Sequence, residues 1–384
     1  MKKLNALFVG MYPHEVNVYR NVFFQNLIFA FADKGVNCTV ISPVSITKYK
    51  TKISKIPYVT HHVTPKGNKV TVYYPRFLSA SSKQIGSFNT EHISEYLYEK
   101  SALNAAKKLK KTFDFVYGHF FLYGGLAAIK IGNSLKIPSF VAYGECDFES
   151  QIRSTYGSLK PRHINGLTGI ISVSSKNTNE LKAEKIFDGI PLITSPNATD
   201  KSLFYVKDKV ESRKLLGIPL DKYIVGFVGG FIHRKGDKRL LEACSGLDDV
   251  YLAYAGRGDN PPSGDNVVFC KALEHEEICT FLNAVDVFCL PTLNEGSCNA
   301  IVEAMSCGKP IVSSDLPFND DALNDDNSIR VNPNSVEEIR GAIGKLKNDE
   351  ELREKLALCA LKDSEKFTIE HRAENILSFI IGLI

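Results

Sequence analysis

The stretch "LNEGSCNAIVEAMSCGKPIVSSD" (residues 293–315) decides the fold, because it joins two apolar runs through a segment with helical periodicity. The run VDVFCLP (285–291) precedes it, and PIVSS (310–314) lies at its end. We expect Ser297 to be the N-cap of a helix from residue 299 to about 307, and Gly308 to end that helix in the left-handed conformation. Two strands joined by one helix predict parallel pairing.

The same alternation continues on both sides of this unit. Apolar runs of strand length are separated by helical or polar segments, including an amphipathic segment at 22–34. The runs are LNALFVG (4–10), CTVISP (38–43), FDFVYGH (113–119), IPSFVAYG (137–144), GLTGIISVS (166–174), YIVGFVGG (223–230), VYLAYAG (250–256) and VVFC (267–270). This pattern predicts parallel sheets covered by helices.

The pattern pauses at SPNATDKSLFYVKDKVESRKLLGIP (195–219), which has turn-forming residues and a short helix but no strand. We place the domain junction there and predict an α/β protein with two Rossmann-like, doubly wound domains, residues 1–197 and 198–366. The apolar tail of residues 367–384 predicts a terminal helix that packs back on the first domain. Two such domains would place the carboxyl ends of their strands across a central cleft.

Composition excludes several classes of protein. The 384 residues are 44% hydrophobic and 23% charged, which is typical of a globular protein with two cores. A formal net charge of +4 is too small to indicate nucleic-acid binding. Nine cysteines without a C-x-x-C pair argue against a disulfide framework or a zinc site. Without a signal-like start or a membrane-spanning run, we expect a cytoplasmic protein.

Lysines cluster in the first half of the chain. Lys48, Lys50, Lys52 and Lys55 alternate with Tyr49, Ile53, Ile56 and Tyr58, and a second cluster comprises Lys107, Lys108, Lys110 and Lys111. Two interpretations stay open: a solvated surface, or a surface for an anionic acceptor or an anionic membrane.

Glu295 and Glu303 lie too far apart to act as one carboxylate pair. Eight residues of helical rise separate them by about 12 Å, whereas glycosidase carboxyl groups stand roughly 5 to 9.5 Å apart. An elongated ligand suits this spacing better. A nucleotide sugar has hydroxyls at both ends, and its pyrophosphate would rest near the amides at the start of the helix. Taken alone, Glu303 would be read as a surface helix residue.

Arg234 and Lys235 stand in the loop GGFIHRKGDK (229–238), directly after a predicted strand. Two fixed cations there would neutralise a leaving diphosphate. The chain has no D-x-D motif, so we expect no required metal and no cofactor. The alternative is a pair of solvated basic residues.

The E-x7-E pattern in EGSCNAIVEAMSCGKPIV (295–312) resembles the signature of retaining GT-B glycosyltransferases of family 4. Three further stretches agree with that family in order: FDFVYGH (113–119), SVSSKNTNELK (172–182) leading to PNATD (196–200), and FVGGFIHRKG (227–236). The resemblance implies a hexosyltransferase that uses a UDP- or GDP-sugar. The implied acceptor is a glycan or a lipid-diphosphate-linked glycan of bacterial surface polysaccharide, assembled at the inner face of the plasma membrane.

The resemblance also implies roles for individual residues. Glu295 would contact the donor sugar, Glu303 the ribose, and Arg234 with Lys235 the pyrophosphate. His119 would lie near the reacting carbon. The sugar hydroxyls would meet the backbone of Gly296, Ser297, Cys298 and Asn299, and the base would lie near Lys271, Ala272 and Leu273. Transfer would retain the anomeric configuration through attack on the face that the phosphate leaves, without a side-chain nucleophile.

Several positions depart from the family pattern. Gly229, Gly230 and Phe231 stand where Gly-Arg is common, so Arg234 would supply the cation. The hinge motif reads Asn197-Ala198-Thr199-Asp200. Two departures border the acceptor side, Tyr143-Gly144-Glu145-Cys146-Asp147 and the loop HEVNVYRNVFF (14–24). The sequence therefore says least about the acceptor.

Two other functions fit the same residues. One is a partner protein of GT-B shape that binds a nucleotide sugar or glycolipid without turnover. The other is a sugar-nucleotide epimerase, which would release nucleotide and altered sugar without an acceptor. Transfer by purified protein distinguishes all three.

Overall fold

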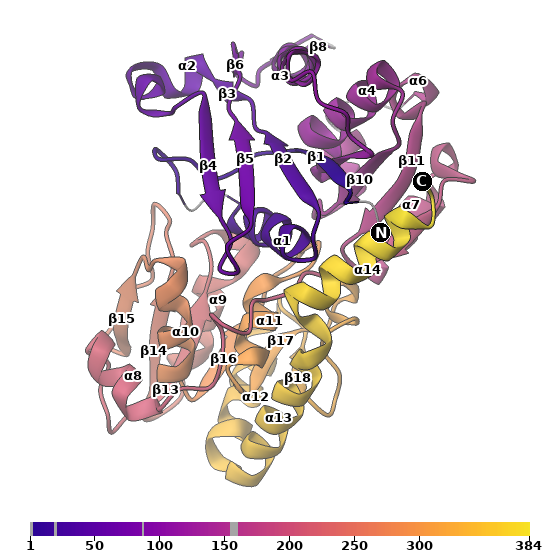
Figure 1. Cartoon of the computed structure of the whole chain (residues 1–384). Helices are drawn as coiled ribbons and strands as arrows, with labels where there is room; N and C mark the ends of the chain where they lie inside the picture. Colours follow the sequence, from indigo (N-terminus) through magenta and orange to yellow (C-terminus); the bar gives the residue numbers. More distant parts are fainter. Residues whose placement is uncertain (1–2, 19–20, 87, 154–159) are drawn as a thin grey trace. The chain divides into compact units, whose positions relative to one another are not determined.

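The computed structural model describes residues 3–18, 21–86, 88–153 and 160–384 (Figure 1). It divides into two compact units. Unit 1 comprises Met1–Pro196 and Ile369–Ile384, and unit 2 comprises Asn197–Thr368. The sequence analysis placed these two divisions after residues 197 and 366. Two positions of the predicted acceptor-side loop, Tyr19 and Arg20, lie outside the described residues.

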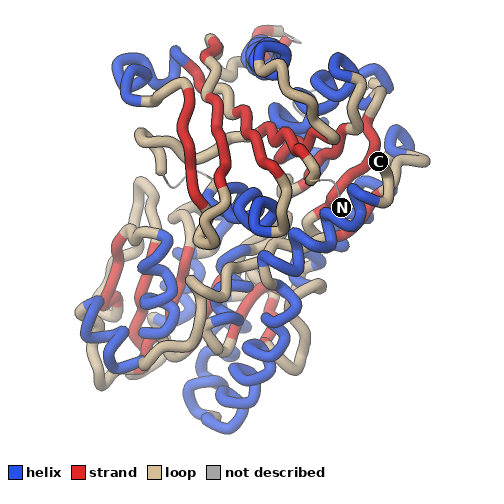
Figure 2. Tube along the Cα trace, viewed as in Figure 1, coloured by secondary structure: helices blue, strands red, loops and turns tan. Residues whose placement is uncertain are grey.

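Unit 1 is built on an eight-stranded sheet with the order β12-β11-β10-β9-β1-β2-β5-β4 (Figure 2). All neighbours pair in parallel except β4 and β5. The strands are β1 (Asn5–Val9), β2 (Asn37–Ile41), β4 (Val59–Val63), β5 (Lys69–Tyr73), β9 (Phe115–His119), β10 (Ser139–Tyr143), β11 (Leu167–Ser172) and β12 (Leu192–Thr194). The central strands are buried on both faces, which explains why they read as continuous apolar runs.

Helices cover both faces of this sheet. One face carries α3 (Glu91–Lys108) and α4 (Leu126–Leu135), which pack on each other through small and aliphatic residues such as Ala102, Ala128 and Ile131. The other carries α1 (Val22–Asp33) beside α14 (Ile369–Ile381). Shorter elements are α2 (Ile46–Tyr49), a 3-10 helix at Lys50–Lys55, α6 (Pro161–Ile164), α7 (Ser175–Ala183) and the hairpin of β7 (Gln84–Ile85) and β8 (Phe88–Asn89).

Helix α14 comes after unit 2 in the chain but belongs to the core of unit 1. The Phe379 ring lies 6.1 Å from that of Phe140 on β10, edge to face. Glu374 forms an ion pair of 3.3 Å with Lys34, which follows α1. The tail segment is therefore buried through its apolar face, as an amphipathic helix requires.

Unit 2 contains a six-stranded, fully parallel sheet with the order β15-β14-β13-β16-β17-β18. Its strands are β13 (Tyr223–Val228), β14 (Val250–Ala255), β15 (Val267–Lys271), β16 (Val287–Leu290), β17 (Ile311–Ser314) and β18 (Ser328–Val331). Its helices are α8 (Lys209–Leu216), α9 (Asp237–Cys244), α10 (His275–Ala284), α11 (Asn299–Ser306), α12 (Val336–Asn348) and α13 (Glu350–Asp363). The strand and helix alternation that the sequence predicts is confirmed in both units.

The predicted cap of α11 is wrong. The residue before the helix is Cys298, which makes no side-chain cap. The Ser297 hydroxyl instead accepts from the backbone N–H of Asn197 at 3.0 Å, and the Asn197 side-chain amide donates to the Ser297 carbonyl at 3.0 Å. Ser297 is thus hydrogen-bonded to Asn197, the first residue of unit 2, instead of capping α11. The other end is as predicted, with Gly308 in the left-handed region at φ 61°.

None of the described helices combines the length and hydropathy that crossing a bilayer requires. The nine cysteines are free thiols.

Candidate active site

The order of strands in unit 2 creates a switch point between β13 and β16. From β13 the chain moves outward through β14 to β15, and then it returns to β16 on the opposite side of β13. In open parallel sheets, the loops at such a point separate at the carboxyl ends of the strands and leave room for a ligand. The loops concerned follow Val228 and Leu290.

These two loops bring together three of the predicted site residues. The Glu295 carboxylate lies 2.7 Å from Arg234 Nη1 and 2.6 Å from Lys235 Nζ, through the same oxygen, Oε1. Thr292 Oγ1 donates to that oxygen at 2.9 Å. Glu295 is 8% exposed, so its carboxylate is largely shielded from water. The sequence analysis assigned these residues separate contacts with a ligand and did not foresee that they contact each other.

Close backbone packing holds the two loops in place. The Leu293 N–H donates to the Arg234 carbonyl at 2.8 Å, and Arg239 donates to the Pro291 carbonyl at 2.8 Å. Gly236 has φ 83°, and a Cβ there would lie 2.5 Å from the Pro291 carbonyl oxygen. Only glycine fits this position, because both the conformation and the contact exclude a side chain.

The electrostatics of the group leave a net positive charge. Burial disfavours the Lys235 ammonium, but the neighbouring Cys298 and Glu295 outweigh burial and raise the pKa of Lys235. Two cations thus face one carboxylate. Burial raises the pKa of the Cys298 thiol to about 11, so this sulfur is protonated at neutral pH and is a poor nucleophile. The site has the charge to bind a phosphate-bearing anion.

Glu303 lies in a second cluster, on the neighbouring helices α10 and α11. Its Oε1 is 3.4 Å from His275 Nε2. One helical turn further along both helices, the sulfurs of Cys279 and Cys307 are 3.9 Å apart. Burial works against the charged imidazole, but the hydrogen bond and charge of Glu303 raise the pKa of His275. The predicted base loop, Lys271 to Leu273, runs from β15 to the start of α10 and so leads directly to His275.

Unit 1 has its own switch point, between β1 and β9. His119 is the last residue of β9, is 6% exposed, and stacks on Phe24 of α1 with centroids 4.3 Å apart. Neither ring nitrogen has a hydrogen-bond partner among the described residues. Burial, with a smaller effect of Arg372, lowers the pKa of His119 to about 3. The imidazole is therefore neutral at physiological pH, and its one donor and one acceptor lack a partner in the part of the chain that the structure describes.

A buried acid stands beside this histidine's loop. Glu145 follows β10, and its carboxylate accepts from the backbone N–H groups of Phe121 at 2.6 Å and Gly144 at 3.0 Å. Burial outweighs these hydrogen bonds and raises the pKa of Glu145 to about 7. The sequence analysis noted Glu145 only as a departure from a family motif. Its 24-residue separation from Phe121 left no local signal for the contact.

The predicted site residues thus fall into three groups. Arg234, Lys235 and Glu295 meet at the switch point of unit 2, Glu303 pairs with His275, and His119 belongs to unit 1. Gly296, Ser297 and Cys298 link Glu295 to α11, which begins at Asn299. Thr292, His275 and Glu145 were missed. Within the described part of the chain, no three His, Cys, Asp or Glu side chains gather as metal ligands would.

Comparison with known sequences shows which proteins this chain resembles. The family described as Glycosyl transferases group 1 matches residues 208–362, all within unit 2. A Bacillus subtilis (strain 168) protein, whose name gives it as glycosyltransferase TuaC of teichuronic acid biosynthesis, is 24% identical over 353 residues, covering 89% of this chain and 88% of that protein. A D-inositol 3-phosphate glycosyltransferase of Stackebrandtia nassauensis is 27% identical over 207 residues, 48% of this chain and 47% of that protein.

Solved structures show the same fold. Sucrose-phosphate synthase from Thermosynechococcus elongatus superposes with a TM-score of 0.77 at 18% identity, covering 100% of this chain and 99% of that one. Anabaena Alr3699/HepE in complex with UDP-glucose has a TM-score of 0.69 at 16% identity, with 99% and 100% covered.

The two parallel-sheet units, with charged loops at a switch point, define the class of this protein as a GT-B fold glycosyltransferase. More particularly, residues 208–362 are similar to the family described as Glycosyl transferases group 1, and the Bacillus subtilis relative that matches 89% of this chain is named a glycosyltransferase.

Proposed function

We propose that unit 2 binds a nucleotide-sugar donor and that the enzyme transfers the sugar with retention to a glycan or a lipid-linked glycan. The observation that carries this proposal is the contact of Glu295 with both Arg234 and Lys235 at 2.7 and 2.6 Å. Two cations on one carboxylate keep one positive charge for a diphosphate. The complex of Anabaena Alr3699/HepE with UDP-glucose supports a uridine nucleotide.

The proposed reaction needs no side-chain nucleophile. The acceptor oxygen forms a bond to the anomeric carbon, and the bond from that carbon to the diphosphate breaks with its electron pair going to the phosphate. The proton of the acceptor hydroxyl passes to the leaving phosphate. Arg234 and Lys235 stabilise the charge that develops there, and Glu295 orients both cations and the sugar.

Unit 1 is proposed to recognise the acceptor. A pocket of 270 Å³ lies in unit 1, near the carboxyl ends of β1 and β2, and is lined by residues that include Met11, Ser45, Lys48, Glu91 and Tyr98. Its hydroxyl, amine and carboxylate groups suit a sugar. The name of the Bacillus subtilis relative refers to teichuronic acid biosynthesis, which supports a surface polysaccharide as the product.

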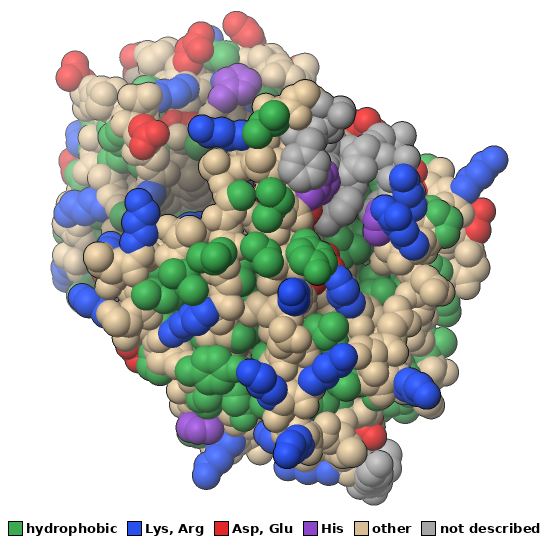
Figure 3. All heavy atoms as spheres, turned by 90° about the horizontal axis from the view of Figure 1, so that it is seen from above, with side chains coloured by type: hydrophobic (Ala, Val, Ile, Leu, Met, Phe, Trp, Pro, Cys, Tyr) green, Lys and Arg blue, Asp and Glu red, His purple; other side chains and the backbone are tan. Residues whose placement is uncertain are grey.

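We also propose that unit 1 contacts the cytoplasmic face of an anionic membrane. Lys48, Lys50, Lys52 and Lys55 are exposed, together with Tyr58 and Ile46. Figure 3 shows the molecule from above, with lysine and arginine side chains spread among apolar ones and few acids near the centre of the view. Ile56 is only 1% exposed, so its predicted place in this surface is wrong; it packs in the core.

A donor screen tests the central proposal. A panel of UDP-, GDP- and ADP-sugars is measured by thermal shift, because a ligand at 100 times its dissociation constant adds about 2.7 kcal/mol of stability. The ligand that stabilises the chain is then tested for transfer with and without EDTA. We expect transfer that EDTA does not change. Binding without turnover would favour a non-catalytic partner, and altered free sugar without an acceptor would favour an epimerase.

Vesicle co-sedimentation tests the membrane contact separately. Replacing Lys48, Lys50, Lys52 and Lys55 by glutamine should abolish binding to anionic vesicles and leave the donor's thermal shift unchanged. The matched control replaces the four exposed lysines at 107, 108, 110 and 111, and it should keep binding. Equal loss in both variants would show a nonspecific charge effect and reject the proposed surface.

A further inference from the structure

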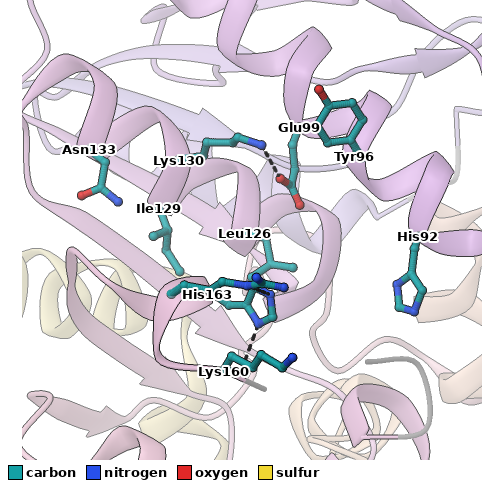
Figure 4. Close-up of a pocket in the computed structure, with 10 residues that line it drawn as sticks. His92, Tyr96, Glu99, Leu126, Ile129, Lys130, Asn133, Lys160 and His163 are labelled. Atoms are coloured by element: carbon teal, nitrogen blue, oxygen red, sulfur yellow. Dashed lines mark hydrogen bonds and ion pairs between the residues drawn. The ribbon is translucent and has the colours of Figure 1, made fainter. Parts of the chain in front are cut away.

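A groove on the helical face of unit 1 has no role in the chemistry described above. It has a volume of 510 Å³ and lies between α3, α4 and α6 (Figure 4). Its lining consists of His92, Tyr96, Glu99, Leu126, Ile129, Lys130, Asn133, Lys160, Arg162 and His163. The switch-point residues His119 and Glu145 are not part of it. Its volume is within the range of about 300–1,000 Å³ that small-molecule sites occupy.

The charges of the groove are unbalanced. Lys130, Lys160 and Arg162 line it, and Glu99 is the one carboxylate among its described lining residues. Figure 4 shows Glu99 directed at Lys130, and the two form an ion pair of 3.1 Å. With Glu99 already neutralised by Lys130, Lys160 and Arg162 leave two positive charges for a ligand.

The electrostatics of His163 agree in part with this positive charge. The pKa of His163 is lowered by burial and then by the neighbouring Arg162, Lys160 and His92. The part of this shift that comes from Arg162, Lys160 and His92 reflects positive charge, which also attracts an anion.

Apolar and aromatic side chains form another part of the groove. Leu126 and Ile129 of α4 line it beside Tyr96 of α3, which is 54% exposed. The Lys130 ammonium lies 5.1 Å from the centre of the Tyr96 ring. This cation–π contact keeps the ammonium against the side of the groove. A ligand that matches these surfaces has both an anionic group and an apolar part.

We propose that this groove binds a phosphate group attached to an apolar chain. Arg162 and Lys160 contact the phosphate, and Leu126, Ile129 and Tyr96 contact the first part of the chain. A phosphate is favoured because two neighbouring cations match its multiple charge and its several acceptor oxygens. A membrane phospholipid and a lipid diphosphate in solution share this chemistry. The inference does not require sugar transfer, because none of the residues proposed to bind the nucleotide sugar is among the described residues that line the groove.

Calorimetric titration with farnesyl diphosphate, without any donor, tests the proposal on the full chain. We expect saturable binding that weakens at least 10-fold, about 1.4 kcal/mol, in the double variant Lys160→Gln/Arg162→Gln. Both side chains are exposed, so the variant should fold normally. The matched control Lys107→Gln/Lys108→Gln also removes two exposed charges and should bind like the wild type. Arg234→Gln should bind like the wild type too, which separates the groove from the donor site.

Three further ligands distinguish a membrane phospholipid from a lipid diphosphate and test whether both the phosphate and the apolar chain are needed. Dihexanoyl phosphatidylglycerol, titrated below its critical micelle concentration, identifies a membrane phospholipid if it binds the wild type but not Lys160→Gln/Arg162→Gln. If it does not bind while farnesyl diphosphate does, the ligand is a lipid diphosphate. Farnesol should bind at least 10-fold more weakly than farnesyl diphosphate. Inorganic pyrophosphate that binds as tightly as farnesyl diphosphate would overturn the apolar half of the proposal. An unchanged dissociation constant in the double variant, or no saturable binding at all, would overturn it entirely.

Discussion

The loops after β13 and β16 in unit 2 contain Arg234, Lys235 and Glu295, whereas β9 of unit 1 ends in an uncharged histidine packed among aromatic rings. Both sets of residues stand at the switch point of a parallel sheet. The fold therefore fixes where a ligand can bind, and the loop residues decide which chemistry the place accepts. A charged group suits a diphosphate, and a neutral imidazole suits a sugar hydroxyl.

The largest expected effect comes from removing the charge in unit 2. Arg234→Gln or Lys235→Met should lower kcat/KM about 100-fold, roughly 2.7 kcal/mol, because charge on the leaving diphosphate loses a fixed cation. Steady-state kinetics with the identified donor measure this loss. Lys238→Gln removes an exposed charge from α9 and should be neutral. If it matches the other two variants, general charge rather than the site explains the effect.

The next effect is a pH dependence confined to unit 1. The folded-state pKa of His119 is about 3, below 6.5, so its contribution to stability is lost as pH falls. The folded-state pKa of Glu145 is about 7, above 4.5, so its contribution is present at low pH and is lost as pH rises through 7. From pH 7.5 to 5 each changes the free energy of unfolding by about 2 kcal/mol, with opposite signs.

Denaturant unfolding at both pH values should show this compensation. Relative to the wild type, Glu145→Gln should lose about 2 kcal/mol on acidification, and His119→Gln should gain about as much. The exposed His61 of β4 provides the control His61→Gln, which should follow the wild type. If the free energy of unfolding changes equally with pH in the wild type and all three variants, His119 is not a buried, uncharged histidine.

A matched pair of glycines tests how tightly each switch point is packed. A Cβ on Gly10 would lie 2.7 Å from Phe24 and 3.0 Å from His119, whereas one on Gly230 would have its nearest neighbour at 3.8 Å. Gly10→Ala should destabilise the protein by about 1.5 kcal/mol, and Gly230→Ala should stay within about 0.5 kcal/mol. Thermal unfolding measures both. Equal melting temperatures would show that unit 1 relaxes around the methyl group.

The smallest effect concerns the two acids of unit 2. Glu303→Gln should raise KM about 10-fold, roughly 1.4 kcal/mol, with little change in kcat, because the ribose loses a charged acceptor. Glu295→Gln should act mainly on kcat, since its contact concerns the reacting sugar. Glu276→Gln, on the exposed side of α10, is the control. The same change in KM for Glu276→Gln and Glu303→Gln would remove the ribose assignment.

The sequence predicted the parts of this molecule whose signals are local. Central strands buried on both faces appear as apolar runs, and Gly308 ends α11 as its position suggests. The group of Arg234, Lys235 and Glu295 was identified by residue type, but not by its mutual contacts. The pairing of His275 with Glu303 crosses 28 residues, and the contact of Ser297 with Asn197 crosses 100. The packing of helices and loops sets such pairs, so the spacing of residues in the sequence does not predict them. We placed Ile56 on the surface because it alternates with lysines, a pattern that is also typical of exposed segments.

Helix α14 also has a consequence for how the protein folds while the ribosome synthesises it. A ribosome must synthesise residues 197–368 before this helix exists, which takes roughly 10 to 35 s at about 5–20 residues per second. During that time the nascent unit 1 lacks Phe379, which packs on Phe140, and the apolar surface that α14 covers is open to chaperones and to wrong contacts. A chain cut after Thr368 should therefore lose the unfolding transition of unit 1 and keep that of unit 2.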